Sequence, residues 1–368
     1  MKLALLISLS ALFQSARGGV PNGLAPKVMI ISMFRDEAEV WYNIPEFNVL
    51  AQNISVPGLS PLFPNVHCTK DSSICQITVG EAEINAASSI AALIYSGRFT
   101  LTSTYFMIAG IAGVNPKVAT IGSVTFARYA VQVGLQFEID AREIPAHFST
   151  GYFPQGSNAP GEFPGTLYGT EVFEVNDALR HLAAQFARRA RLKDNTESKA
   201  VRTQYAKNPA FAAAAAAPTV ALCDTATSDT FWSGNLLGEA FEGTTKVFTN
   251  GSAVYCTTQQ EDNGTLTALM RGALAKRMDF SRIIIMRSAS DFDRPPPAES
   301  ALANLLGPAP GFESSVLNLH LAGVKVVEAI VTGWSATFER GIKATNYVGD
   351  IFGSLGGTPD FGPGSIFK

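Results

Sequence analysis

The sequence has little charge and few residues of the kinds that bind metal ions. Asp, Glu, Lys and Arg make up 16% of the 368 residues, and their charges sum to −3 at pH 7. A chain with this balance lacks the basic surface that nucleic-acid binding requires. The four cysteines and four histidines form neither a Cys-x-x-Cys pair nor a histidine cluster at ligand spacing. We therefore expect no nucleic-acid partner, no metal site and no cofactor.

Long apolar runs are absent after residue 18. A membrane-spanning helix needs about 20 consecutive apolar residues, whereas the alanine-rich run 212–217 ends at Pro218. We therefore expect no transmembrane span in the mature chain. The first 18 residues differ, because Lys2 precedes an apolar run over 3–13 and small residues follow. This layout predicts a secretory signal peptide cleaved near Ala16 or Gly18, with an uncleaved signal anchor as the alternative.

Secretion would place the cysteines in an oxidising compartment, where disulfides form. Four cysteines allow three pairings. Cys68 and Cys75 flank a turn-like spacer between two strand-like runs, so we favour a Cys68–Cys75 bond, which leaves Cys223 to pair with Cys256. We expect an extracellular protein, with association with the cell wall or cell surface left open.

Three Asn-x-Ser/Thr sequons begin at Asn53, Asn250 and Asn263. In a secreted protein such sequons are acceptors for N-linked glycans. We predict glycosylation at Asn53 and Asn250, and none at Asn263 if that residue lines a binding site.

Buried strand patterns alternate with amphipathic helical patterns along the chain. This alternation predicts a single α/β domain over 26–368, with a central mixed sheet flanked by helices, after a signal peptide (1–18) and a linker (19–25). The expected strands are 27–33, 76–79, 105–113, 118–124, 136–139 and 218–222, and the expected helices are 34–41, 81–93, 175–192, 265–277 and 317–330.

Two stretches rich in small residues suggest contact with a ligand. The expected strand 105–113 ends in a small-residue turn in which Ala112 and Gly113 would let the backbone approach a ligand closely. Residues 149–170 are dense in Gly and Pro but also contain recurring aromatic residues, which favours a substrate-covering loop over a linker.

Asp291 follows the most strongly buried strand pattern, residues 283–286. Pro295 and the two prolines after it prevent this strand from continuing into a helix. Open α/β sheets bind ligands at the carboxyl ends of their strands, so we predict a functional carboxylate at Asp291. The alternative is that Asp291 or Asp293 only caps a turn.

Several segments occur in an order that resembles the purine nucleoside permease (NUP) family of fungi. Beyond that family they are similar to the superfamily of nucleoside phosphorylases and methylthioadenosine/adenosylhomocysteine nucleosidases. The resemblance spans about residues 26–333. The segments are 80–87 (GEAEINAA), 109–113 (AGIAG), 127–129 (ARY), 150–152 (TGY), 227–231 (TSDTF) and 287–291 (RSASD).

The superfamily resemblance implies roles for residues around a purine base. Asp291 would act as the general acid that protonates purine N7 when the N-glycosidic bond breaks, which requires a pKa raised by burial. Ser290 and Arg287 would orient Asp291. Phe231 would stack on the base with Trp232 beside it, unless both are ordinary core aromatics.

The resemblance also implies a ribose site at Glu261, whose carboxylate would accept hydrogen bonds from the 2′- and 3′-hydroxyls. The register between Glu261 and Asn263 stays open, because the superfamily has Met-Glu where this chain has Gln260-Glu261.

Water is favoured over phosphate as the nucleophile. Phosphorylases carry a cationic and a hydroxyl residue at the positions that Ile108 and Ile111 occupy here. Glu37, with Glu261, would then activate a water molecule. The sequence thus predicts a secreted purine nucleosidase that hydrolyses purine nucleosides to base and ribose. A purine nucleoside phosphorylase is the first alternative, and a non-catalytic nucleoside-binding, uptake or storage protein is the second. Homodimer formation is left open.

Overall fold

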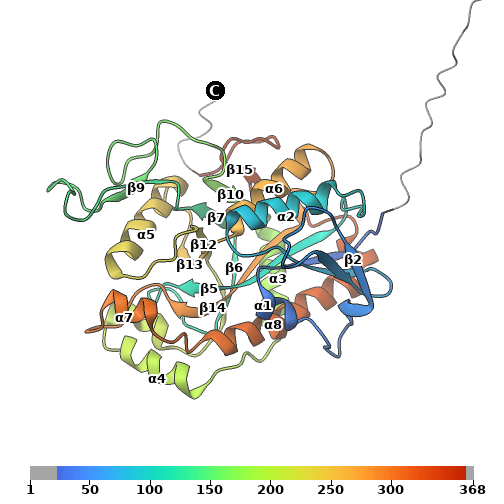
Figure 1. Cartoon of the computed structure of the whole chain (residues 1–368), viewed down its shortest axis with the longest axis horizontal. Helices are drawn as coiled ribbons and strands as arrows, with labels where there is room; N and C mark the ends of the chain where they lie inside the picture. The colour runs from blue at the N-terminus through green and yellow to red at the C-terminus, as the bar shows by residue number, and fades with distance from the viewer. Residues whose placement is uncertain (1–22, 362–368) are drawn as a thin grey trace, which may run out of the picture.

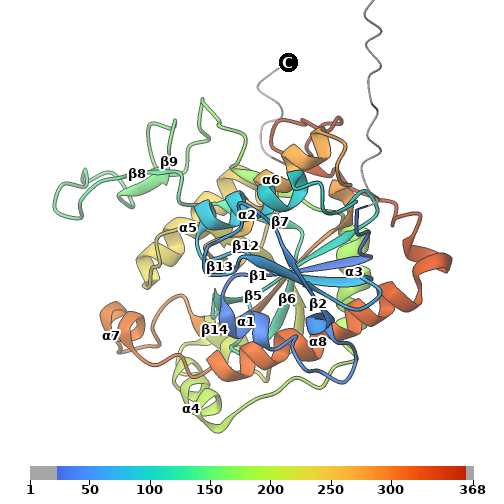
Figure 2. The ribbon, with the colours of Figure 1, turned by 45° about the vertical axis from the view of Figure 1, so that its right-hand side comes forward.

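The structure, a computed structural model, describes residues 23–361. The predicted signal peptide and most of the predicted linker lie outside these residues, so the division into signal peptide, linker and single domain stays a prediction. The described chain is built on one large mixed sheet, which crosses the centre of the molecule (Figures 1 and 2). Its strands are β1 (Val28–Ser32), β2 (Gln52–Ser55), β3 (Asn65–Cys68), β4 (Ile74–Thr78), β5 (Tyr105–Val114), β6 (Val124–Ala127), β7 (Tyr129–Gln132), β10 (Val172–Glu174), β11 (Val220–Leu222), β12 (Asp224–Thr227), β13 (Tyr255–Gln259), β14 (Ile283–Phe292) and β15 (Gly349–Asp350).

The middle of the sheet consists of parallel strands that are buried on both faces. β1 pairs in parallel with β4 and β5, and β5 pairs in parallel with β14. Successive side chains of a strand point to opposite faces. Accordingly Ile283 and Ile285 of β14 enter one apolar cluster, while Ile284 and Met286 enter another on the other face. This explains why the sequence of such a strand is an unbroken apolar run.

Helices cover both faces of the sheet. Figure 1 shows α2 (Glu83–Tyr95) and α6 (Asp262–Leu274) side by side over one face, with α8 (Phe312–Thr332) on the other. α3 (Asp177–Ala187) packs against α8 and contributes to the same apolar cluster. The predicted α/β fold with a central mixed sheet flanked by helices is confirmed. The other helices are α1 (Arg35–Glu39), α4 (Thr196–Tyr205), α5 (Asn235–Thr249) and α7 (Ala301–Leu306), with short helices η1 (Val49–Ala51), η2 (Pro209–Ala215), η3 (Phe280–Arg282) and η4 (Trp334–Phe338).

Both predicted disulfides are confirmed. Cys68 of β3 bonds Cys75 of β4, and Cys223, just before β12, bonds Cys256 of β13. Each bond joins segments that neighbour one another in the sheet.

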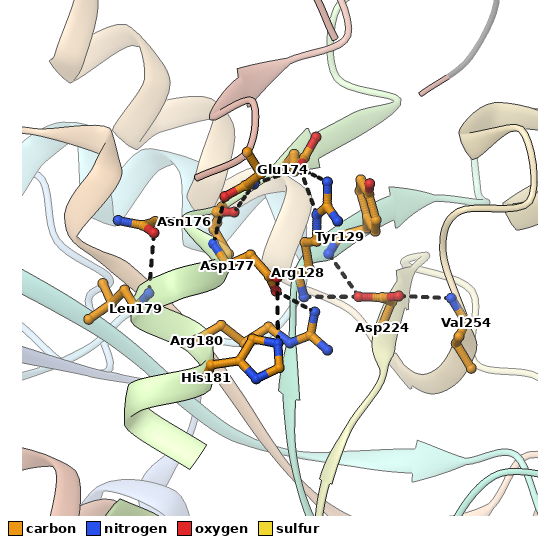
Figure 3. A network of polar contacts seen from close by, with 12 residues as sticks. Arg128, Tyr129, Glu174, Asn176, Asp177, Leu179, Arg180, His181, Asp224 and Val254 are labelled. Atoms are coloured by element: carbon orange, nitrogen blue, oxygen red, sulfur yellow. Dashed lines mark hydrogen bonds and ion pairs between the residues drawn. The ribbon is translucent and has the colours of Figure 1, made fainter. Parts of the chain in front are cut away.

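The 127–129 segment belongs to a polar network that joins neighbouring strands (Figure 3). One oxygen of the Asp224 carboxylate accepts hydrogen bonds from the backbone N–H groups of Arg128 and Tyr129, both at 2.9 Å. The other oxygen accepts one from Val254 N at 2.8 Å. The Arg128 side chain pairs with Glu174 of β10, whose pKa burial raises to about 8. These residues fix the β7 side of the sheet.

Two strand predictions are wrong. Residues 118–124 turn instead of extending, because Val118 N and Ala119 N both donate to Asn115 O, and the strand β6 begins only at Val124. Residues 109–113 form no turn. β5 continues through them to Val114, because β14 pairs with it along this whole length and β13 joins at its end.

The predicted covering loop is also wrong. Residues 149–170 include β9 (Tyr152–Pro154), which forms a two-stranded hairpin with β8 (Gln136–Glu138). This hairpin projects away from the body of the molecule (Figure 2). None of residues 149–170 lines the cavity described below.

One helix among residues 23–361, α8, is long and apolar enough to cross a membrane by length and composition. In the fold, 56% of its most apolar window is buried. Leu319, Val326 and Ile330 are among the side chains that pack beneath the sheet.

Candidate functional site

A cavity of about 350 Å³ lies beside the carboxyl-terminal halves of β5 and β14 and the end of β13. Such a position agrees with the rule that α/β sheets bind ligands where their strands end. The cavity brings together residues that the sequence scatters over more than 250 positions. The predicted site residues that line it are Glu37, Ala112, Gly113, Phe231, Trp232, Glu261, Arg287, Ser290 and Asp291.

Arg287 lies at the centre of a buried polar cluster in the cavity wall. It is 1% exposed, and its Nη2 atom lies 2.5 Å from Asp262 Oδ1 and 3.2 Å from Glu261 Oε2. Its Nη1 atom donates to Ile111 O at 3.0 Å. A buried guanidinium needs such partners, because burial of an unpaired charge is costly. Two carboxylates and a strand carbonyl therefore hold Arg287 in place.

Glu37 faces the cavity from α1 and is 1% exposed. Its two carboxylate oxygens accept hydrogen bonds from Met33 N at 2.7 Å and Ile111 N at 2.6 Å. Burial raises the pKa of Glu37 to about 8, and this effect outweighs the opposite effect of the nearby Arg287 charge. The side chain thus holds a proton up to mildly alkaline pH.

Asp291 and Ser290 both line the cavity although they are adjacent in a strand. The register of β14 against β5 shifts between Ala289 and Asp291, which is a β-bulge. A bulge re-aims side chains that regular alternation would send to opposite faces. Ser290 Oγ lies 2.6 Å from Asp291 Oδ1 and 3.1 Å from Ala112 O. Burial raises the pKa of Asp291 above its ordinary value. The pair lies within β14, and not beyond its end as the sequence suggested.

Glu261 occupies the position just before α6 and is 5% exposed. Its Oε1 atom accepts a hydrogen bond from Ala82 N at 3.3 Å, and its Oε2 atom faces Arg287. Burial raises its pKa more than the Arg287 charge lowers it. The cavity therefore contains Glu37, Glu261 and Asp291, three carboxyl groups that all have raised pKa values.

Aromatic side chains also line the cavity. Phe231 is 60% exposed at its rim, whereas Trp232 is buried and packs on Phe241 with ring centroids 4.4 Å apart. Phe34 and Phe312, which also line the cavity, have centroids 6.3 Å apart. The lining of the cavity thus combines polar and aromatic side chains.

Asn263 does not reach the cavity. It is fully buried within the first turn of α6, where Nδ2 donates to Thr170 O at 2.6 Å and Oδ1 accepts from Thr227 Oγ1 at 2.7 Å. The start of α6 at Asp262 decides this register, since it leaves Glu261 before the helix and turns Asn263 toward the core. The prediction that Asn263 lines the site is wrong.

Sequence reasoning missed several lining residues. They come from β13, from α7, from the start of α8 and from the turn after β1, and they include Met33, Phe34, Thr258, Gln259, Asn304, Leu305 and Phe312. The three prolines before α7 could have indicated that the chain turns back after β14, which brings α7 to the cavity. Among residues 23–361, no three His, Cys, Asp or Glu side chains are arranged to hold a metal ion.

The family described as purine nucleoside permease (NUP) matches residues 25–343. The chain belongs to this family. A purine nucleoside permease of Candida albicans is 46% identical over 347 residues, which cover 93% of this chain and 84% of that protein. A protein of Schizosaccharomyces pombe named "probable purine nucleoside permease" is 42% identical over 320 residues, covering 84% of this chain and 90% of that one. The predicted family is therefore confirmed, and its name agrees with the predicted purine nucleoside ligand.

Solved structures similar to this permease-family chain include two bacterial enzymes. One is a 5′-methylthioadenosine/S-adenosylhomocysteine nucleosidase of Helicobacter pylori, with 15% identity and a TM-score of 0.48, covering 84% of this chain and 98% of that one. The other is a futalosine hydrolase of the same organism, with 15% identity and a TM-score of 0.48, covering 83% and 97%.

The permease relatives overturn the predicted activity and localisation. Proteins 42–46% identical to this chain are named as permeases, which is the word for transporters. The predictions of a hydrolase, with Glu37 activating water, and of a secreted protein are therefore wrong. The phosphorylase alternative fails for the same reason. A likeness of short segments is compatible with binding as well as with catalysis.

Proposed function

We propose that this chain binds purine nucleosides in the cavity bordered by α7 and serves their transport. The observation that carries the proposal is one cavity of about 350 Å³ whose lining combines the carboxyl groups of Glu37, Glu261 and Asp291 with several aromatic rings. A purine nucleoside has a flat face for stacking and several nitrogen and hydroxyl groups for hydrogen bonding, so it needs both kinds of partner. The names of the relatives support the transport role.

The polar contacts are assigned by the chemistry of each group. Asp291, whose raised pKa favours the protonated form, donates a hydrogen bond to a ring nitrogen of the purine, and Ser290 orients it. Glu261, held by Arg287, accepts hydrogen bonds from the ribose hydroxyls. Phe231 stacks on the base from the rim.

The charge of the cavity favours nucleosides over nucleotides. Arg287 is the only Lys, Arg or His among the lining residues that the structure describes, and Asp262, Glu261 and Ile111 O already engage it. A phosphate group would therefore meet carboxyl groups and no free cation. An uncharged ribose is the better occupant.

Calorimetric titration of the purified chain tests the binding. Adenosine, inosine and guanosine should bind, and adenosine monophosphate should bind at least tenfold more weakly. Asp291→Ala, which removes the donor, and Glu261→Gln, which removes the charged acceptor, should each lose about tenfold in affinity, since one hydrogen bond to a buried group is worth roughly 1.4 kcal/mol. Glu143→Gln is the matched control, because Glu143 is exposed in the β8–β9 loop away from the cavity. Absence of purine nucleoside binding would refute the proposal.

The transport role needs a cellular measurement. Cells without their own nucleoside uptake should accumulate radiolabelled adenosine when they express the chain, and accumulation should fall with Asp291→Ala but not with Glu143→Gln. Binding without any gain in accumulation would leave a nucleoside-binding protein and reject the role in transport.

A further inference from the structure

The large sheet ends at β2. Within residues 23–361, β2 pairs with β3 on one side only, and the strand order stops there. An edge strand of this kind presents free N–H and C=O groups to which the edge of another chain can add. The four residues of β2, Gln52–Ser55, include no charged side chain and no proline that would block such pairing. The shortness of β2, which has four residues, limits such pairing but leaves the edge open.

A sequon lies within this strand. Asn53 and Ser55 are two residues apart, so they lie on the same face, and both are exposed while Gln52 and Ile54 are partly buried. The acceptor amide and the hydroxyl that glycosyl transfer requires are thus presented together on the last strand. A bulky glycan here would cover the exposed face and obstruct the free edge beside it.

The three sequons differ in what the folded chain permits. Asn250, the residue that follows α5, is exposed. Figure 1 shows α5 and β2 on opposite sides of the molecule. Asn263 is fully buried and uses both ends of its amide in hydrogen bonds. The fold therefore has room for glycans at Asn53 and Asn250 and none at Asn263.

The disulfide next to β2 supplies an independent observation. Cys68, which pairs with Gln52 across β2 and β3, is bonded to Cys75. Disulfides persist in the oxidising lumen of the secretory pathway, the compartment in which asparagine is glycosylated. Membrane proteins pass through this lumen as well, so the disulfide does not require that the chain be released from the cell.

We propose that Asn53 carries an N-linked glycan that blocks edge-to-edge pairing at β2, and that Asn250 carries a second glycan without this role. The donor is an oligosaccharide joined through a diphosphate to a lipid. A bond forms between Asn53 Nδ2 and C1 of the first sugar, the bond from C1 to the phosphate oxygen breaks, the lipid diphosphate leaves, and the amide nitrogen loses one proton. This inference does not depend on the proposed transport role.

Glycopeptide mapping of the full chain from a fungal host tests the modification. Release of the glycans by an amidase converts each modified Asn to Asp, so mass spectrometry should find Asp at positions 53 and 250 and unchanged Asn at 263. An unmodified Asn53 beside a modified Asn250, or a glycan on Asn263, would overturn the proposal.

Sedimentation velocity tests the role at the edge. Asn53→Gln and Ser55→Ala should each remove the same glycan and produce a several-fold rise in self-associated protein, whereas Asn250→Gln should lose a glycan without that rise. Trimming of the glycans on the folded wild-type chain by an endoglycosidase, which leaves one uncharged sugar on each Asn, checks the result without any effect on folding. Asn53→Lys should restore the monomer by placing a charge on the strand. Unchanged association after loss of the Asn53 glycan would contradict the protective role.

Discussion

Gly110 and Arg287 are partners in register across β5 and β14, and no side chain fits between them. A Cβ atom added at Gly110 would lie 2.4 Å from Arg287 Nη1, 2.8 Å from Met33 Sδ and 3.0 Å from Glu37 Oε1. The glycine thus leaves the space that the buried guanidinium occupies.

Gly110→Ala should therefore disturb the buried polar cluster around Arg287. The methyl group must displace Arg287 from its carboxylate partners, and overpacking of this kind costs about 1–3 kcal/mol of unfolding free energy. Urea denaturation should show that loss, and calorimetry should show weaker nucleoside binding. Gly243→Ala is the matched control, because nothing lies within 4 Å of an added Cβ there. Gly243 lies within α5, so that change should stabilise the chain by about 0.5–1 kcal/mol. Equal stabilities of the two variants would contradict the packing around Arg287.

Glu37 should make stability depend on pH. Its pKa rises from 4.5 to about 8 on folding, mainly through burial. Between these two values the folded chain holds a proton that the unfolded chain has lost, so the free energy of unfolding falls as pH rises from about 4.5 to about 8. Urea denaturation across this range should show a shallower fall for Glu37→Gln than for the wild type, because the amide does not titrate. Burial also raises the pKa values of Glu83 to about 7 and of Glu174 to about 8, and these two groups act equally in both proteins. Parallel curves would show that Glu37 does not titrate in this window.

The two disulfides should differ in what their removal costs. Cys68 and Cys75 close a short loop with a sequence separation of 7, whereas Cys223 and Cys256 are separated by 33 residues. Loop-closure entropy predicts a loss of about 2 kcal/mol for the first bond and about 4 kcal/mol for the second. Denaturation of the paired Cys→Ala variants measures both losses, and a larger loss for the Cys68/Cys75 pair would contradict the ordering. A third variant with all four changes checks that the two losses add.

The sequence was most informative where one local property decides the structure. Unbroken apolar runs predicted β1, β5 and β14, because a strand buried on both faces has no polar positions. The lining of the cavity by Glu37 followed from its place after β1, whereas Asp291 lines it from within β14, just past the apolar run. By contrast, Phe312 lines the cavity only because α8 crosses beneath the sheet, and the opposite fates of Glu261 and Asn263 depend on the residue at which α6 begins. Neither depends on local sequence alone.

Function was the least predictable property, because a fold and a pocket are compatible with more than one use. The carboxyl groups of Asp291, Glu261 and Glu37 serve binding as readily as bond cleavage. A likeness of segments could not distinguish these uses, and the relatives at 42–46% identity are named as permeases.

The helix α8 cannot both span a membrane and pack against the sheet. It is apolar enough for a bilayer, yet its buried residues complete one face of the sheet, and its first residue, Phe312, lines the cavity. Extraction of α8 into lipid would dismantle the wall on which a ligand rests. By linkage, a bound nucleoside would stabilise the fold that holds α8 against the sheet by RT ln(1 + [L]/Kd). Removal of α8 from the core would therefore cost more free energy with the cavity occupied than with it empty.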